Sequence, residues 1–489
     1  MAVTAPTTAP RIEYDSLGAL SVPGDAYYGI HTARAVENFS ISRVTVAAYP
    51  EFVGALAAVK RAAAEANQEL GLLDGRRAGA IAAACDEIRA GRLHEHFVVD
   101  AIQGGAGTST NMNANEVIAN RALEILGFAR GDYSELHPLE HVNMSQSTND
   151  VYPTAIKIAL QEQLAALVTT LRRVSAAFGV KAEEFKDILK MGRTQLQDAV
   201  PMTLGQEFGT YAVMVGEDAD RLGEAAQLIC EISLGGTAIG TGLNSHPRYA
   251  DLVCEKLTAV TGLSLSTAHD LVEATQDVGA FVQVSGVLKR TALKLSKICS
   301  DLRLLSSGPR AGLNEINLPA VQPGSSIMPG KVNPVIPEVV NQVAFEIVGC
   351  DVAVSMAAES GQLQLNAFEP IIAHSLFQSL THLDRACRTL IDKCVTGITA
   401  NRERLLDSVT HSIGVVTALS PYIGYAEAAR IAKKALMTGE PIPDLVVAEQ
   451  LLTSDQVDDL LKPEALVGPR ELLVLQREIR TAMEGSANS

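Results

Sequence analysis

LQEQLAALVTTLRRVSAAF, residues 160–178, carries large apolar side chains at alternating intervals of four and three residues. These side chains are Leu160, Leu164, Leu167, Leu171, Val174 and Phe178. The spacing places them on one face of a long α-helix, as in the seam of a helical bundle. Similar stripes are formed by Phe208, Tyr211 and Val215 and by Leu288, Ala292, Leu295, Cys299 and Leu302. The sequence therefore predicts a mainly α fold with a central bundle of long helices.

The composition narrows the class of protein. The chain has 489 residues, a formal net charge of −16, 47% hydrophobic residues and only 4% aromatic residues. This length predicts two or three domains, and the acidic charge disfavours binding to nucleic acid or to anionic membranes. The seven cysteines are scattered without a CxxC pair, and MAVTAPTTAP at the start lacks the apolar core of a secretion signal. We therefore expect no disulfide framework, no cysteine-type zinc site and a cytoplasmic location.

Changes in pattern divide the chain into three expected domains. Residues 1–148 combine strand-like segments with helical ones such as PEFVGALAAVKRAAAEANQEL and AGAIAAACDEIRA. Residues 149–403 form the long-helix bundle, and Pro153 suits the first turn of its first helix. Residues 404–489 return to shorter helices and form a small C-terminal helical domain.

One long segment is unusually poor in cations. No lysine or arginine occurs between Val332 and Asp384, and acidic residues interrupt the apolar run at positions 338, 346, 351 and 359. A membrane span would avoid those charges, whereas a helix in the middle of an assembly would be covered by other subunits. The sequence therefore predicts an oligomer with a helical core.

Four polar segments lie beside the apolar stripes. They are QGGAGTSTNMNANE (103–116), MSQSTNDVYPT (144–154), MGRTQLQDAVPMTLGQE (191–207) and GSSIMPGKVNP (324–334). A single segment of this kind is usually a helix cap. Their repetition favours an anion site instead, because hydroxyls, amides and helix N-termini bind carboxylates. A small dicarboxylate is the expected ligand, with Lys331 and Arg34 as candidate cations.

Rival motifs fail on spacing. In GSSIMPGKV, five residues separate Gly324 from Gly330 and Val332 follows Lys331, which disagrees with a phosphate-binding loop. GTGLNS at 240–245 lacks the third glycine of a dinucleotide loop. His94 and His96 have no third metal ligand nearby in the sequence, so no metal site is expected. No serine, histidine and aspartate form a recognisable triad, which points to a base other than histidine.

The four polar segments resemble the conserved regions of the fumarase/aspartase superfamily, in the same order. GSSIMPGKVNP matches that superfamily's signature GSSxMPxKxNP, and the likeness runs from RIEYD at residue 11 to about residue 465. Gln195, KVNPVIPEVVNQ, YYGIHT and LRLLSSGPRAGLNEINLPA are similar to the aspartase branch, whereas GTGLNSHPRYA and KPEALVGPR are more similar to fumarases. The resemblance implies a three-domain superfamily fold whose helical bundles assemble into a multi-subunit core, and a homotetramer in which three subunits build each active site.

The aspartase resemblance implies reversible deamination of L-aspartate to fumarate and ammonia through an enediolate intermediate. Ser325 is then the base, and Thr108, Ser147, Thr148 and Ser326 are candidate donors to the carboxylate that gains charge. Lys331, Asn333, Thr194 and Gln195 are expected at the α-carboxylate, and Asn149 at the amino group. The glycines and proline around Ser325 indicate a mobile lid. No cofactor is expected, and activation by a divalent metal such as magnesium is not predicted from the sequence.

Several alternatives stay open. Arg34 matches a family arginine in HTAR but equally suits a structural ion pair. His141 lies near the second anion site of fumarases, although a structural histidine is favoured. Fumarate hydratase is the nearest competing activity. A non-catalytic crystallin-like protein of the same fold is disfavoured by the intact Ser325, Lys331 and Asn333.

Overall fold

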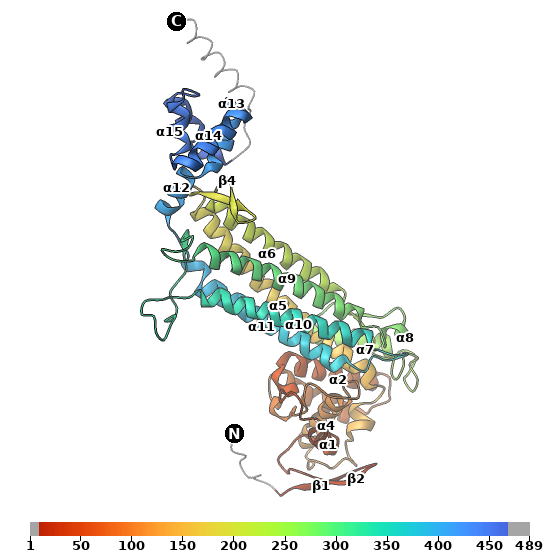
Figure 1. Cartoon of the computed structure of the whole chain (residues 1–489). Coiled ribbons are helices and arrows are strands. Elements are labelled where there is room, and N and C mark those ends of the chain that lie inside the picture. Colours follow the sequence, from red (N-terminus) through yellow and green to blue (C-terminus); the bar gives the residue numbers. More distant parts are fainter. Residues whose placement is uncertain (1–8, 468–489) are drawn as a thin grey trace. The chain divides into compact units, whose positions relative to one another are not determined.

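A computed structural model describes residues 9–467 of the chain, which fold mainly into helices (Figure 1). Their contacts divide the chain into two compact units. Unit 1 contains residues up to 170, 218–293 and 342–385; unit 2 contains residues 171–217, 294–341 and those from 386 onward. The expected division at residues 148 and 403 remains a prediction.

The N-terminal part of unit 1 combines a strand pair with helices, as expected. Strands β1 (Arg11–Asp15) and β2 (Gly18–Val22) pair in antiparallel register, with Arg11 opposite Val22. They are followed by α1 (Ile30–Asn38), α2 (Pro50–Glu69), α3 (Gly75–Arg89) and α4 (Thr108–Ile125). Short helical turns are η1 (Val46–Ala48), η2 (His94–His96) and the π-helix η3 (Pro138–Val142). The alanine-rich faces of α2 and α3 are buried, which allows close packing between them.

Five long helices confirm the predicted bundle architecture. They are α5 (Thr148–Glu184), α6 (Leu204–Gln227), α9 (Gly279–Leu305), α10 (Val335–Glu359) and α11 (Glu369–Lys393). Every residue of the three predicted apolar stripes is buried, with at most 1% of its surface exposed. The α5 helix begins at Thr148, so Pro153 lies inside the helix and not in its first turn, where the sequence pattern predicts it.

Contacts within each unit hold these helices together. In unit 1, the ring of Phe52 on α2 packs against Tyr152 on α5 and Phe377 on α11. In unit 2, Phe178 on α5 packs against Phe208 and Tyr211 on α6. These aromatic contacts explain how a chain with few aromatic residues still fills its core.

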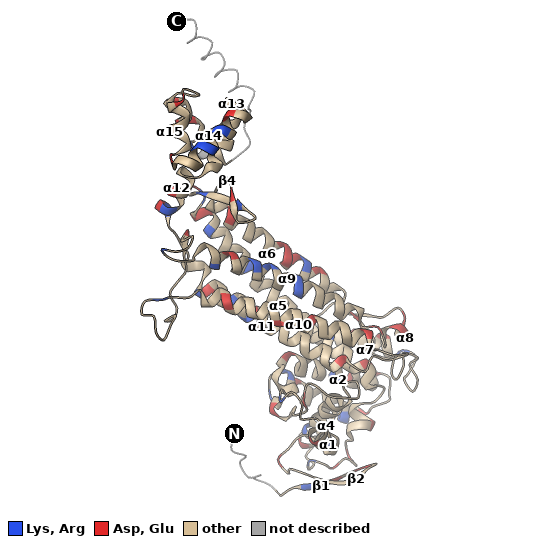
Figure 2. Cartoon of the chain, viewed as in Figure 1, with Lys and Arg blue, Asp and Glu red and all other residues tan. Residues whose placement is uncertain are grey.

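The α10 helix is apolar and has no positive charge (Figure 2). By length and composition it is the one described helix that could cross a membrane, although only 33% of its apolar window is buried. Its acidic residues are used in polar contacts: Asp351 pairs with Lys289, and Glu346 accepts from Gln378 and contacts His382 at 2.7 Å. All of these residues belong to unit 1.

Shorter elements complete the fold. The remaining strands are β3 (Leu189–Thr194), β4 (Gln197–Thr203), β5 (Glu231–Ile232), β6 (Ser266–Thr267), β7 (Ile316–Asn317) and β8 (Thr399–Ala400). The remaining helices are α7 (Tyr249–Thr261), α8 (Leu271–Ala274), η4 (Val395–Gly397), α12 (Arg402–Thr410), η5 (Ile413–Val415), α13 (Val416–Ile423), α14 (Tyr425–Thr438), α15 (Ile442–Ala448), α16 (Ser454–Leu460) and α17 (Pro463–Leu466). Within unit 2, the helices from α13 to α16 share a hydrophobic core around Leu419, Ile431 and Val446. The last part of KPEALVGPR lies outside the described residues.

Candidate active site

The predicted site residues fall into two groups, one in each unit. Arg34, Thr108 and the segment Ser147–Asn149 belong to unit 1. Thr194, Gln195 and the signature segment 324–334, with Ser325, Ser326, Lys331 and Asn333, belong to unit 2.

Thr108 is the first residue of α4 and is exposed. The preceding Gly107 has a φ of 88°, and a Cβ at that position would lie 2.4 Å from the ring of Tyr152. Only glycine therefore allows the chain to enter α4 in this way. The Thr108 hydroxyl donates to the carbonyl of Gly105 at 2.7 Å, so it must rotate to donate to a substrate carboxylate.

A hollow of about 200 Å³ lies beside Thr108 and is also lined by Arg34 and His31. The Arg34 guanidinium makes two bonds to the Asp15 carboxylate, at 2.7 and 2.9 Å. This pairing lowers the pKa of Asp15 to about 2, chiefly through the hydrogen bond from Arg34. Because Asp15 already neutralises its charge, Arg34 adopts the ion-pair role that the sequence left open, although it still borders the hollow.

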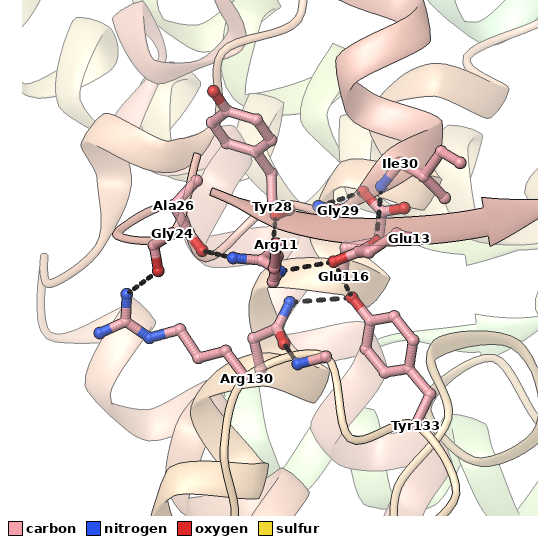
Figure 3. A network of polar contacts seen from close by, with 12 residues as sticks. Arg11, Glu13, Gly24, Ala26, Tyr28, Gly29, Ile30, Glu116, Arg130 and Tyr133 are labelled. Atoms are coloured by element: carbon pink, nitrogen blue, oxygen red, sulfur yellow. Dashed lines mark hydrogen bonds and ion pairs between the residues drawn. The ribbon is translucent and has the colours of Figure 1, made fainter. Parts of the chain in front are cut away.

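Two buried carboxylates hold α1, the helix that carries Arg34 (Figure 3). Glu116 on α4 accepts from the backbone N–H groups of Gly29 at 2.7 Å and His31 at 2.9 Å. Glu13 on β1 accepts from the N–H of Ile30 at 2.8 Å. Burial raises the pKa of Glu116 to about 7, although the N–H bonds favour its ionised form. These caps join α1 to α4 and thereby place Arg34 near Thr108.

Ser147 precedes α5 and caps it. Its Oγ accepts from the N–H of Asn149 at 3.3 Å, and its own N–H donates to the Asp150 carboxylate at 3.0 Å. The other Asp150 oxygen accepts from the N–H groups of Gly235 and Thr237 at 3.0 and 2.9 Å. Asp150 therefore attaches the start of α5 to the segment SLGGTAIGTG, residues 233–242. The last residues of this segment resemble a nucleotide-binding loop only superficially.

The Asn149 side chain has a defined orientation. Its Nδ2 donates to the carbonyl of Ala238 at 2.7 Å, and because a carbonyl only accepts, the amide nitrogen must face it. The amide oxygen therefore points the other way and can accept from an N–H group. In addition, Pro153 lacks the N–H that would bond the Asn149 carbonyl four residues earlier in the helix. Both oxygens of Asn149 suit an amino group.

A polar cluster lies beneath this segment. Lys60 on α2 is fully buried, and its Nζ donates to Asn143 Oδ1 at 2.9 Å. Asn111 on α4 donates to both Asn143 Oδ1 and Thr148 Oγ1, each at 3.1 Å. Burial lowers the pKa of Lys60 to about 7 and raises that of Asp150 to about 6. Sequence reasoning missed this cluster; its only signal was the run of asparagines in NMNAN.

In unit 2, Thr194 and Gln195 stand at the exposed tip of the β3–β4 hairpin. Gln195 and Leu196 are the two loop residues, with φ values of 54° and 62°. Two-residue loops with both φ values positive normally contain glycine or asparagine, so this tip is strained. Leu196 is 70% exposed, which is unusual for a leucine in so tight a turn. Such strain is typical of functional segments.

Charged side chains support the base of that hairpin. Lys190 is buried on β3 and contacts Glu315 at 2.9 Å, and Arg193 contacts the same carboxylate at 2.6 Å. Glu315 lies only nine residues before Gly324, so this ion pair joins the hairpin to the segment leading into the signature loop.

The signature segment forms a non-helical loop, as predicted, and hydrogen bonds close the loop at its neck. The N–H of Gly324 donates to the carbonyl of Lys331 at 2.8 Å, and Asn333 Nδ2 donates to the carbonyl of Gly324 at 2.7 Å. Between these points Ile327 is 83% exposed, and Ser326 and Lys331 are also exposed. Asn333 therefore holds the neck of the loop, and its remaining amide N–H is available to a carboxylate.

Ser325 lies inside this loop with its oxygen surrounded by donors. Its Oγ accepts from the N–H groups of Ile327 at 3.2 Å and Met328 at 3.0 Å. Two backbone donors stabilise an alkoxide more than a neutral hydroxyl, so the alkoxide of Ser325 forms more easily than that of an isolated serine. The role of Ser325 as the base stays a prediction.

The histidines considered in the sequence have structural partners. His94 Nε2 contacts the carbonyl of Ile88 at 2.8 Å, and His141 Nδ1 accepts from the N–H of His137 at 2.8 Å. Among residues 9–467, no three histidine, cysteine or carboxylate side chains are grouped to hold a metal ion.

Comparison with known proteins gives two family matches. The family described as "Lyase" matches residues 18–349, and the one described as "Fumarase C C-terminus" matches residues 415–468. Among solved structures, a "fumarate lyase:delta crystallin" from Brucella melitensis, bound to cobalt, is 55% identical with a TM-score of 0.92, covering 94% of this chain and all of that one. A class II fumarase from Schistosoma mansoni is 36% identical with a TM-score of 0.91, covering 95% of this chain and all of that one.

The sequence relatives identify the branch. An aspartate ammonia-lyase from Pseudomonas aeruginosa is 59% identical over 95% of this chain and 98% of that protein. One from Helicobacter pylori is 58% identical over 94% of this chain and 98% of that protein. Both identities far exceed the 36% shared with the fumarase structure. With its fold and its signature loop, the chain therefore belongs to the aspartate ammonia-lyase family.

Proposed function

We propose that this chain is a carbon–nitrogen lyase that reversibly converts L-aspartate into fumarate and ammonia. The observation that carries the proposal is the Ser325 oxygen, which accepts two backbone N–H bonds at 3.0 and 3.2 Å. A proton bound to carbon is hard to remove, and such a stabilised alkoxide is suited to that step. The family relatives support L-aspartate as the substrate.

The reaction proceeds in two steps. The Ser325 alkoxide takes a proton from the methylene next to the side-chain carboxylate, and the electrons of that C–H bond move into the carboxylate to give an enediolate. The enediolate then forms the carbon–carbon double bond of fumarate, and the C–N bond breaks with its electron pair leaving on nitrogen as ammonia. Ser325 finally releases its proton to the solvent or to ammonia.

Donors to the enediolate determine the rate of the first step. Thr108, Ser147, Thr148 and Ser326 are assigned this role, and each donor contributes about 3 kcal/mol by comparison with single oxyanion-hole deletions. Thr148 begins α5, a helix of 37 residues, so the positive end of the helix dipole adds to the effect.

The other end of the substrate is assigned to unit 2 and to Asn149. Lys331, Asn333, Thr194 and Gln195 bind the α-carboxylate in this proposal. The exposed amine of Lys331 supplies the positive charge that the acidic chain otherwise lacks. Asn149 accepts from the amino group through the amide oxygen that Ala238 orients.

We further propose a cytoplasmic homotetramer in which subunits share active sites, with no organic cofactor. All seven cysteines are free, which suits a reducing compartment. Phe345, Val352 and Met356 are 66%, 57% and 61% exposed on α10 and lie on one helical face. Large apolar side chains so exposed favour burial against other subunits. Light scattering of the purified protein tests the tetramer, and assays with and without magnesium test the need for a metal.

Comparing substrates tests the leaving group. A site built to accept from an amino group rejects an analogue that leaves its polar atoms unpaired. We expect kcat/KM for L-aspartate to exceed that for L-malate by about a hundredfold or more, and D-aspartate to be inactive. Fumarate absorbance and released ammonia are the readouts. L-malate turnover equal to or faster than L-aspartate turnover would identify a fumarate hydratase instead.

A further inference from the structure

The hydroxyl of Thr148 cannot donate toward Asn111. Its Oγ1 accepts a hydrogen bond from Asn111 Nδ2 at 3.1 Å. An amide nitrogen has no acceptor capacity, so the threonine proton cannot point toward Asn111. The proton is therefore free for another acceptor, and in the proposed reaction that acceptor is the carboxylate that gains charge.

The orientation of Asn111 depends in turn on Asn143. Asn111 Nδ2 also donates to Asn143 Oδ1 at 3.1 Å, and the same oxygen accepts from Asn115 Nδ2 at 3.2 Å. The nitrogen of the Asn143 amide is held by the carbonyl of Gln146 at 3.2 Å. If the Asn143 amide were reversed, its nitrogen would face these donors. Asn111 would then have to turn its amide oxygen toward Asn143, and its nitrogen would no longer donate to Thr148.

Lys60 fixes the direction of this chain at its buried end. Its Nζ donates to Asn143 Oδ1 at 2.9 Å, and its residue is 0% exposed. The protonated amine carries N–H donors and no acceptor, so in that form Lys60 requires oxygen at that position of Asn143. From Lys60 to Asn143, Asn111 and Thr148, the donor or acceptor role of each polar atom therefore agrees with that of the one before, and the carbonyl of Gln146 supports the same orientation of Asn143.

We propose that Lys60 is a positioning residue that, through Asn143 and Asn111, directs the Thr148 hydroxyl toward the substrate carboxylate. This inference rests on the proposed lyase function. Lys60 itself does not touch the substrate in this arrangement. The competing explanation is that Lys60 only stabilises the fold, as any buried and hydrogen-bonded lysine would.

A double-mutant cycle separates the two explanations. The variants are Lys60→Met, Thr148→Val and the double variant, each assayed for kcat and KM with L-aspartate and for inhibition by succinate, an unreactive dicarboxylate. If Lys60 acts through Thr148, Lys60→Met lowers kcat by about 10-fold or more in the wild-type background. This loss should stay below the roughly 10²–10³-fold loss that follows when a donor is removed outright. In the Thr148→Val background the same change should alter kcat by less than about twofold, because the hydroxyl is already absent.

The inhibitor supplies a second readout. Succinate does not develop the extra charge, so its inhibition constant should change much less than kcat in Lys60→Met. A purely structural role instead predicts the same fold-loss of kcat in both backgrounds, and that additivity would overturn the proposal. Lys157→Met is the matched control, because Lys157 is another lysine of unit 1 and its Nζ donates to the carbonyl of Glu231 at 2.7 Å. It should keep wild-type kinetics.

A second cycle covers the case in which Lys60→Met does not fold. Asn111→Ala breaks the same chain one step closer to Thr148, and its effect should also vanish in the Thr148→Val background. Equal losses in both backgrounds would refute the route through Thr148. If the wild-type protein deaminates L-aspartate but the losses of kcat are additive in both cycles, only this inference is rejected. A wild-type protein without that activity rejects the proposed function and this inference together.

Discussion

Ser325, the proposed base, is a weak acid whose oxygen accepts hydrogen bonds from the backbone. The serine oxygen is placed where two successive backbone N–H groups converge, and these donors favour its alkoxide form. The loop also keeps Gly324 immediately before the serine, which leaves room for the closed neck. In the proposed reaction, the base therefore depends on the local backbone conformation of this loop.

Replacing Ser325 by alanine should keep the fold and the assembly but remove turnover. Loss of a general base lowers kcat by roughly 10²–10⁴-fold. Steady-state assays with L-aspartate and size-exclusion chromatography measure the two properties. Ser306→Ala is a suitable control, because its hydroxyl donates to the backbone carbonyl of Leu302 at 2.8 Å. If Ser325→Ala retains more than about a tenth of the wild-type kcat, Ser325 is not the base.

Lys60 should make stability depend on pH. Burial lowers its pKa from 10.5 to about 7, so between these values the unfolded chain holds a proton that the folded chain releases. Stability contributed by this site therefore rises as pH increases through that range. The free energy of unfolding of the wild type, relative to Lys60→Met, should increase by roughly 3 kcal/mol between pH 6 and pH 9.

Urea unfolding at the two pH values measures this difference, with a change of the exposed Lys433, Lys433→Met, as the reference for a general lysine effect. A constant difference between wild type and Lys60→Met would mean that the buried lysine keeps its ordinary pKa.

Two segments of unit 2 place site residues by unusual backbone geometry. The β3–β4 hairpin turns through Gln195 and Leu196 in left-handed conformations, and the signature loop closes through Gly324, Lys331 and Asn333. The sequence marks the loop through its glycines and prolines. It does not mark the hairpin, because neither turn residue is glycine or asparagine.

Gly324→Ala should open the neck of the signature loop. An added Cβ would lie 2.5 Å from the carbonyl oxygen of Lys331 and 2.8 Å from the nitrogen of Asn333, so the neck must widen. We expect kcat to fall by about 10-fold or more, since displacement of a reacting group by about 1 Å costs about 10²-fold. The free energy of unfolding should change by less than about 1 kcal/mol, because the loop is largely exposed.

Gly330→Ala provides the comparison within the same loop. Gly330 has a φ of 83°, but an added Cβ would meet nothing within 4 Å, so alanine there introduces backbone strain without a clash. Its kcat should be reduced less than that of Gly324→Ala. Full activity in Gly324→Ala would show that the closed neck is not needed for catalysis.

The whole molecule distributes the predicted site over two units of one chain. Thr148 belongs to unit 1 and Ser325 to unit 2, and the exposed face of α10 favours association between copies. Sites shared between subunits, which the family resemblance implies, stay a prediction.

Mixing two inactive proteins tests shared sites. Ser325→Ala and Thr148→Ala subunits, dissociated together and reassembled, should recover part of the wild-type activity, because some sites then receive both intact residues. Each variant treated alone in the same way is the control. Proven subunit exchange without any recovery of activity would contradict shared sites.

The helical class, the three apolar seams, the loop at 324–334 and the family could all be predicted from the sequence, because periodic burial and a short ordered motif are local properties of the chain. The predicted start of α5 was wrong, since Ser147 and Asp150 cap the helix several residues before the proline. Only the tertiary structure decided three other features. They are the pairing of Arg34 with Asp15, the strained turn at Gln195, and the hydrogen-bond chain from Lys60 to Thr148. Each depends on which donors and acceptors are brought together out of water, and residues as distant as 60 and 143 acquire their roles only when the fold buries them side by side.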